Sequence, residues 1–274
     1  ASAELGGGVS RESRLPGLAE WGRVRDYRVH LLERLENVSI YRENPLSGED
    51  IFQFSAKDQF DYSHVLLATG ATWRRNGMGR MHREDIPGLD KLSVFSPDDI
   101  MDGISVQGRV VVFDDDHFYM GGVIAEKLRG EGHEVSLVTP APDVSTWTHK
   151  TLEQKKIQKL LIELGVELVT QTDLAAVHSG MIELSCVFTD NLTQSACESL
   201  ILVTERIPNV DLFHGLDAEP ERLSGVGIKT LRCIGDCYAP GTIAAAVHSG
   251  HLAARGLQSA PQEEVPFLRE RIQL

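Results

Sequence analysis

Residues 109–138 have the pattern of an apolar strand, an amphipathic helix and a second apolar strand. Of all the features of the sequence, this pattern restricts the possible folds most strongly. The strands are Arg109–Phe113 and Glu134–Val138, and the helix spans Gly122–Arg129. Unbroken apolar runs are typical of parallel strands, because helices cover both faces of a parallel sheet. A unit of about 30 residues has the size of a mononucleotide-binding half. The segment therefore predicts an α/β fold of the Rossmann type.

The same alternation continues on both sides of this unit. It predicts helices at 20–35, 151–164 and 243–257, strands at 63–68, 166–170, 200–204 and 231–235, and antiparallel strands within 174–188. Alternating strands and helices favour parallel sheets.

Charge and composition exclude several classes of partner. The net charge is −13 and the pI is near 5.2, whereas a nucleic-acid partner requires a concentrated positive field. No apolar run approaches the roughly 20 residues that span a bilayer, and residues 1–8 do not resemble a signal peptide. We therefore expect a cytoplasmic protein with no nucleic-acid and no membrane partner.

The four cysteines do not have the spacing of a metal site. They are Cys186, Cys197, Cys233 and Cys237, and no matching Cys or His pair completes a zinc or iron–sulfur pattern. We expect reduced thiols and no metal site.

Two short motifs point to a ligand at the ends of strands. Ala68-Thr69-Gly70 follows the strand at 63–68, and Gly235-Asp236 follows the strand at 231–235. Small residues let a ligand approach the backbone, and a carboxylate there can accept hydrogen bonds from ribose or ribityl hydroxyls. Each motif has a structural alternative: a glycine turn for the first, and a turn aspartate or a helix N-cap for the second.

A third motif is the glycine run Gly6-Gly7-Gly8, whose alternative is a flexible chain end. Taken together, the motifs predict one nucleotide-binding crevice and no catalytic residue in this chain. The predicted cofactor-binding residues are Gly7, Gly8, Ala68, Thr69, Gly70, Gly235, Asp236, Thr242 and Ile243.

In this order and spacing the motifs resemble flavoproteins with two dinucleotide-binding domains. Segments that resemble the trimethylamine and dimethylamine dehydrogenase branch are 16–21, 25–28, 114–122, 125–128 and 239–244. The resemblance implies that residues 1–95 plus 226–274 form a FAD/ADP-type domain. Within it lies an inserted NAD-type domain at 96–225. The first strand and glycine turn of the family would precede Leu5, so the FAD/ADP-type domain is expected to be incomplete.

The inserted domain departs from the dinucleotide-binding pattern. Where the glycine positions are expected, the chain has Asp114, Asp116 and Tyr119, and Thr139 stands near the expected ribose-binding acid. Negative side chains at this position repel a pyrophosphate. We therefore expect no NAD(P) binding, a helix capped by these carboxylates, and aromatic side chains filling the space. A metal bound by consecutive aspartates is a disfavoured alternative.

The resemblance implies the C-terminal region of an FMN and iron–sulfur amine dehydrogenase. In that reading FMN and a 4Fe-4S cluster lie in a preceding region, and this region holds ADP or FAD weakly. A homo-oligomeric parent would oxidise a methylated amine and pass electrons to an electron-transfer flavoprotein, while this chain alone would be inactive. The alternatives are an NAD(P)H-dependent enzyme resembling 2,4-dienoyl-CoA reductase, or a non-catalytic nucleotide-binding module.

Overall fold

The computed structural model describes residues 3–56 and 63–257. The chain forms two compact units, each built from two segments: unit 1 comprises residues 1–44 and 72–207, and unit 2 comprises 45–71 and 208–274. A discontinuous organisation was expected, but the boundaries differ from the predicted 95/96 and 225/226. Residues 1–44 cluster with the segment 72–207, and β3 at 93–95 pairs with the sheet of this same unit.

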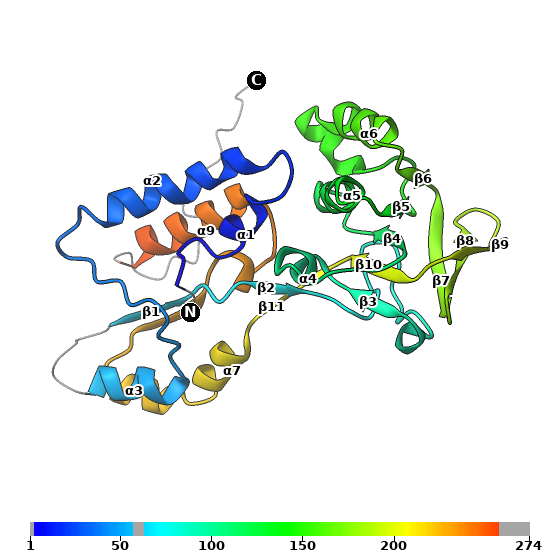
Figure 1. Cartoon of the computed structure of the whole chain (residues 1–274). Coiled ribbons are helices and arrows are strands. Elements are labelled where there is room, and N and C mark those ends of the chain that lie inside the picture. The colour runs from blue at the N-terminus through cyan, green and yellow to red at the C-terminus, as the bar shows by residue number, and fades with distance from the viewer. Residues whose placement is uncertain (1–2, 57–62, 258–274) are drawn as a thin grey trace, which may run out of the picture. The chain divides into compact units, whose positions relative to one another are not determined.

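Unit 1 contains a parallel five-stranded sheet (Figure 1). The strand order is β3-β10-β4-β5-β6, and every neighbouring pair is parallel. The strands are β3 (Ser93–Phe95), β10 (Ser199–Val203), β4 (Arg109–Asp114), β5 (Glu134–Val138) and β6 (Glu167–Val169). The parallel α/β organisation expected from the sequence is therefore present.

Strand β4 contributes side chains to two hydrophobic cores. Val110 and Val112 join the core that also contains residues of α5 (Met120–Gly130). Val111 and Phe113 belong to the second core, which contains residues of the antiparallel strands. Burial on both faces explains why this segment is an unbroken apolar run. The remaining helices of unit 1 are α1 (Gly8–Glu12), α2 (Gly22–Leu32), α4 (Pro97–Met101) and α6 (Gln154–Glu163).

A three-stranded antiparallel sheet also belongs to unit 1 (Figure 1). It consists of β7 (Thr172–His178), β8 (Met181–Cys186) and β9 (Leu192–Ala196) in that order. The sequence predicted antiparallel strands within 174–188, and the structure confirms them. The third strand lies beyond that range and is mostly exposed, so it has no apolar alternation to reveal it.

Unit 2 is built around a pair of parallel strands. β1 (His64–Leu67) pairs with β12 (Thr230–Cys233), which confirms the expectation that these distant segments share a sheet. Its helices are α3 (Gly48–Ala56), α7 (Asp211–Asp217), α8 (Pro220–Gly225) and α9 (Ile243–Gly256).

The chain passes between the units at two strands that pair with each other. β2 (Ala71–Trp73) and β11 (Arg206–Pro208) form a separate two-stranded sheet. Among residues 3–56 and 63–257, no helix is long and apolar enough to cross a lipid bilayer.

Candidate functional site

The predicted site residues of unit 2 gather at the carboxyl ends of β1 and β12. Leu67 is the register partner of Cys233, so the two strands end together. Ala68-Thr69-Gly70 and Gly235-Asp236 leave the sheet at this common edge. In open α/β sheets, ligands bind outside this edge.

Thr69 is fixed by Asn209, a residue that the sequence did not single out. Thr69 Oγ1 donates to the backbone carbonyl of Asn209 at 2.6 Å, and Asn209 Nδ2 donates to the carbonyl of Thr69 at 3.1 Å. The amide of Asn209 also donates to the carbonyl of Gly70 at 2.9 Å. Thr69 Oγ1 lies 2.9 Å from Cys237 Sγ. These contacts hold the chain after β1 in one conformation.

The turn after β12 brings α9 against Gly235. Gly235 has φ +60, its amide donates to Ser249 Oγ at 3.0 Å, and a Cβ here would lie 3.7 Å from that of Ala246. Asp236 Oδ1 accepts from the amide of Gly241 at 3.1 Å, while Thr242 Oγ1 caps α9 by accepting from the amide of Ala245 at 3.3 Å. Asp236 Oδ1 thus stabilises the turn before α9, and Thr242 is the N-cap of this helix.

The edge is open to a ligand. Ala68, Thr69 and Thr242 are exposed, and a Cβ added at Gly70 would meet no atom within 4 Å. Unobstructed backbone at the end of a parallel sheet, close to the start of α9, fits the needs of a nucleotide phosphate or ribose.

The other two predicted residues, Gly7 and Gly8, belong to unit 1. Gly7 has φ +53 and stands before α1, and a Cβ there would meet no atom within 4 Å. Their convergence with the residues of unit 2 stays a prediction.

Cys233 of unit 2 is held as a thiol. Burial, and the neighbouring Cys237 thiol, raise the pKa of Cys233 to about 11. Protonated thiols are poor nucleophiles and poor metal ligands. Within the described part of the chain, no group of three or more His, Cys, Asp or Glu side chains could hold a metal ion.

The carboxylates of the acidic turn, defined as Asp114–His117, do not cap α5 as predicted. The helix begins only at Met120, its N-cap Tyr119 makes no side-chain capping bond, and Asp114 Oδ1 accepts instead from the amide of His117 at 3.0 Å. The predicted helix at 122–129 lies within α5, so the helix is present but the aspartates do not cap its first turn. The Asp114 side chain nevertheless packs against the first turn, since a Cβ on Gly121 would lie 2.5 Å from Asp114 Cγ.

The other two aspartates bind a loop that lies more than 30 residues earlier in the sequence. Asp115 Oδ2 accepts from the amides of Met81 at 3.0 Å and His82 at 2.9 Å. Asp116 Oδ1 pairs with Arg80 Nη2 at 3.0 Å, and Arg80 Nε donates to the Asp116 carbonyl at 2.7 Å. The protein's own loop thus supplies the amides and the guanidinium that satisfy these carboxylates.

Aromatic side chains stand where a third glycine was expected. The Tyr119 ring packs edge-on against Trp21 with centroids 4.6 Å apart, and against Phe118 at 5.1 Å. The Tyr119 hydroxyl donates to Glu12 Oε2 at 2.6 Å. This position therefore does not offer the close backbone approach that a dinucleotide requires.

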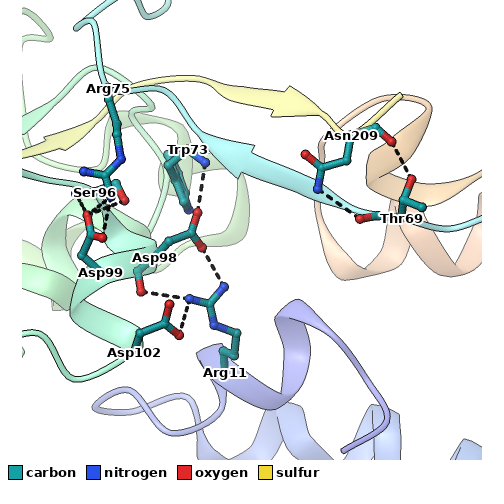
Figure 2. A network of polar contacts seen from close by, with 9 residues as sticks. All are labelled: Arg11, Thr69, Trp73, Arg75, Ser96, Asp98, Asp99, Asp102 and Asn209. Carbon is teal, nitrogen blue, oxygen red and sulfur yellow. Dashed lines mark hydrogen bonds and ion pairs between the residues drawn. The ribbon is translucent and has the colours of Figure 1, made fainter. Parts of the chain in front are cut away.

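A polar network in unit 1 anchors the start of its second chain segment (Figure 2). Arg11 donates to Asp98 Oδ1 at 2.8 Å and to Asp102 Oδ1 at 2.7 Å, and Asp98 Oδ2 accepts from the amide of Trp73 at 3.1 Å. Figure 2 also shows the Thr69–Asn209 pair of unit 2. The sequence did not reveal the network, because its members are polar residues far apart in the chain.

Comparisons with known proteins match both the fold and the sequence. Residues 95–198 match the sequence family described as the OYE-like second alpha/beta domain. The chain is 31% identical to dimethylamine dehydrogenase of Hyphomicrobium sp. (strain x) over 295 aligned residues. The alignment covers 98% of this chain and 39% of that protein.

Two solved structures of amine-oxidising proteins are similar at higher identity. Histamine dehydrogenase from Rhizobium sp. 4-9 superposes with a TM-score of 0.95 at 39% identity, covering 100% of this chain and 42% of that one. For 6-hydroxypseudooxynicotine amine oxidase from Pseudomonas geniculata N1 the TM-score is 0.88 at 39% identity, covering 94% and 38%. The chain is homologous to amine dehydrogenases and spans less than half the length of these relatives.

Proposed function

We propose that this chain is the nucleotide-binding region of a flavin-dependent amine dehydrogenase, and that unit 2 holds ADP or FAD. The observation that carries the proposal is the joint end of β1 and β12, where Ala68-Thr69-Gly70 meets Gly235-Asp236 in a chain homologous to amine dehydrogenases. The FAD/ADP-type domain with an NAD-type insertion is the fold that best accounts for this arrangement.

The residues of unit 2 would hold the nucleotide mainly through backbone groups. Gly70 and Gly235 let a phosphate or ribose approach the chain, and the Asp236 carboxylate suits a sugar hydroxyl. The first turn of α9 adds favourable partial charge for a phosphate. Bound FAD would supply redox chemistry, whereas bound ADP would supply only binding energy.

The parent protein would oxidise an amine elsewhere in its structure. We propose that FMN and a 4Fe-4S cluster lie outside these residues, since no described cysteine group suits a cluster. Electrons would then pass to an electron-transfer flavoprotein. The relatives act on dimethylamine, histamine and a nicotine-derived amine according to their names, so the substrate class is an amine with an oxidisable CH–NH bond.

The experiment uses the full-length protein in which this chain occurs. After denaturation, mass spectrometry of the released nucleotides should find ADP or FAD in about 1:1 ratio with protein, in addition to any FMN. Gly235→Val should lose the adenine nucleotide. Gly250→Ala, on α9 in open space, is the matched control and should retain it.

Anaerobic mixing with trimethylamine, dimethylamine or histamine then tests the reaction. One of these amines should bleach the flavin absorbance without added nicotinamide. Bleaching by NADPH alone would favour the reductase that resembles 2,4-dienoyl-CoA reductase. Absence of any flavin, together with bound ADP, would favour a non-catalytic nucleotide-binding module.

A further inference from the structure

We propose that the acidic turn Asp114–His117 is a proton-controlled latch that holds residues 79–82 against the carboxyl end of β4. This inference concerns unit 1 alone and does not depend on the nucleotide site of unit 2.

The latch consists of direct contacts between the turn and the loop. Asp115 accepts the amides of Met81 and His82, and Asp116 binds Arg80 through both its carboxylate and its carbonyl. Gly79 packs so closely that a Cβ there would lie 2.3 Å from Asp115 Oδ2. The position of the loop therefore depends on the charge and placement of these carboxylates.

The turn buries more negative charge than its neighbours neutralise. Asp114 and Asp115 have no exposed surface, and Asp116 and His117 are 7% and 4% exposed. Arg80 is a fixed cation that pairs with Asp116 of the turn. His117 Nε2 lies 2.8 Å from Asp115 Oδ1 and adds a second positive charge only when the imidazole is protonated.

Asp114 is the residue of the turn whose negative charge is not balanced by a hydrogen-bond donor at both carboxylate oxygens. Its Oδ1 accepts one amide, while its Oδ2 is buried without a hydrogen-bond partner among the residues that the structure describes. The first turn of α5 carries no acidic residue, and Ser199–Val203 of β10 is uncharged. The facing charges are those of Asp115, Asp116 and His117, together with Arg80 through Asp116. Within the loop, His82 pairs through Nδ1 with Asp173 at 2.9 Å.

Protonation of Asp114 removes the uncompensated charge. Burial first, and the neighbouring Asp116 second, raise the pKa of Asp114 to about 7. Below that pH the carboxyl is neutral and the turn is stable. Above it, a buried carboxylate faces Asp116, and both repulsion and desolvation favour movement of the turn and release of residues 79–82.

Trp147 lies where its fluorescence can report this movement. The Trp147 amide donates to the His117 carbonyl at 2.9 Å, and the Arg80 guanidinium lies 4.4 Å from the centroid of the Trp147 ring. Trp147 therefore contacts the turn through its backbone amide and the loop through its indole ring. Displacement of either one changes its surroundings and its fluorescence.

The test is a pH titration of tryptophan fluorescence from pH 5 to 9 in the full-length protein, with hydrogen exchange of the Met81 and His82 amides in parallel. Wild type should show a transition near pH 7 and at least a threefold loss of amide protection above it, after correction for intrinsic exchange. Asp114→Asn should abolish both changes. Trp147→Phe should remove only the fluorescence transition.

The control is Asp143→Asn, which removes the carboxylate that pairs with His149 close to Trp147 and should leave the transition in place. An unchanged transition in Asp114→Asn would overturn the proposal. If that variant does not fold, carboxyl-carbon NMR of the wild type decides the question. A titration midpoint of Asp114 near the ordinary 4 would overturn the latch, and one near 7 would support it.

Discussion

Thr69 and Asn209 exchange two hydrogen bonds, each side chain donating to the backbone carbonyl of the other residue at 2.6 and 3.1 Å. The reciprocal pair joins the chain after β1 to the chain before α7. Each substitution removes one side-chain donor, so Thr69→Val and Asn209→Ala should each lower the free energy of unfolding by about 1 kcal/mol. Both bonds join the same two segments, so the loss of one weakens the other. The double variant should lose less than the sum, as urea unfolding can measure.

A control for this pair is Thr193→Val on the exposed strand β9, which should change stability by less than about 0.5 kcal/mol. Full additivity of the two single variants would show that the two hydrogen bonds are energetically independent.

The acidic turn should prevent reduction of the parent flavoprotein by nicotinamide cofactors. A phosphate placed about 4 Å from one carboxylate costs on the order of 4 kcal/mol at an effective dielectric of 20, and Tyr119 also removes the close backbone approach. Stopped-flow mixing of the full-length protein with NADH or NADPH should therefore leave the flavin absorbance unchanged for minutes. Rapid bleaching would contradict both this prediction and the amine-dehydrogenase proposal.

The stability of the chain should fall as the pH rises through the range in which Asp114 loses its proton. Its pKa is about 7 in the folded state and about 4 in the unfolded chain. Between these values the folded state binds the additional proton, so stability decreases by on the order of 4 kcal/mol from pH 4 to pH 7 and then levels off. Asp114→Asn should lack this slope and be more stable than wild type above pH 7. Parallel curves for the two proteins, measured by denaturant unfolding across this range, would refute the assignment.

Two glycines of α5 should respond in opposite ways to the same substitution. A Cβ on Gly121 would lie 2.5 Å from Asp114 Cγ, so Gly121→Ala should destabilise the protein by about 1–3 kcal/mol. Gly130 faces open space, and Gly130→Ala should stabilise it by up to about 1 kcal/mol. Thermal unfolding of the two variants under identical conditions checks the difference, and a shift of the same sign in both would contradict it.

The sequence predicted the elements whose signal is local. β4 is buried apart from Arg109 and β10 is fully buried, and α5 and α9 lie where their patterns predicted helices. β2 and β11 have no such signal, because three polar or mixed residues become strands only through pairing with each other. For the same reason no local pattern indicates Asn209, because its role depends on Thr69 far earlier in the chain.

The contacts of the acidic turn could likewise be predicted from the sequence only in part. Its charge pattern correctly indicated an unusual strand–helix junction. The partners of its carboxylates, Arg80 and the amides of Met81 and His82, come from a loop whose position no local pattern specifies. The capping prediction failed because Asp114 accepts the amide of His117 within the turn, while Asp115 and Asp116 bind residues 80–82.

The pairing of β1 with β12 has a consequence for the order in which the chain assembles. These strands pair residues 64–67 with residues 230–233, and the whole second segment of unit 1, residues 72–207, lies between them in the sequence. Closing so long a loop is entropically costly while that segment is a coil, and contacts distant in sequence form slowly. Once residues 72–207 have folded and β2 has paired with β11, the two halves of unit 2 are tethered at neighbouring positions. We therefore expect pulse-labelling hydrogen exchange to protect β4 and β10 before β1 and β12, so that the strand ends proposed to bind the nucleotide are among the last parts of the chain to form.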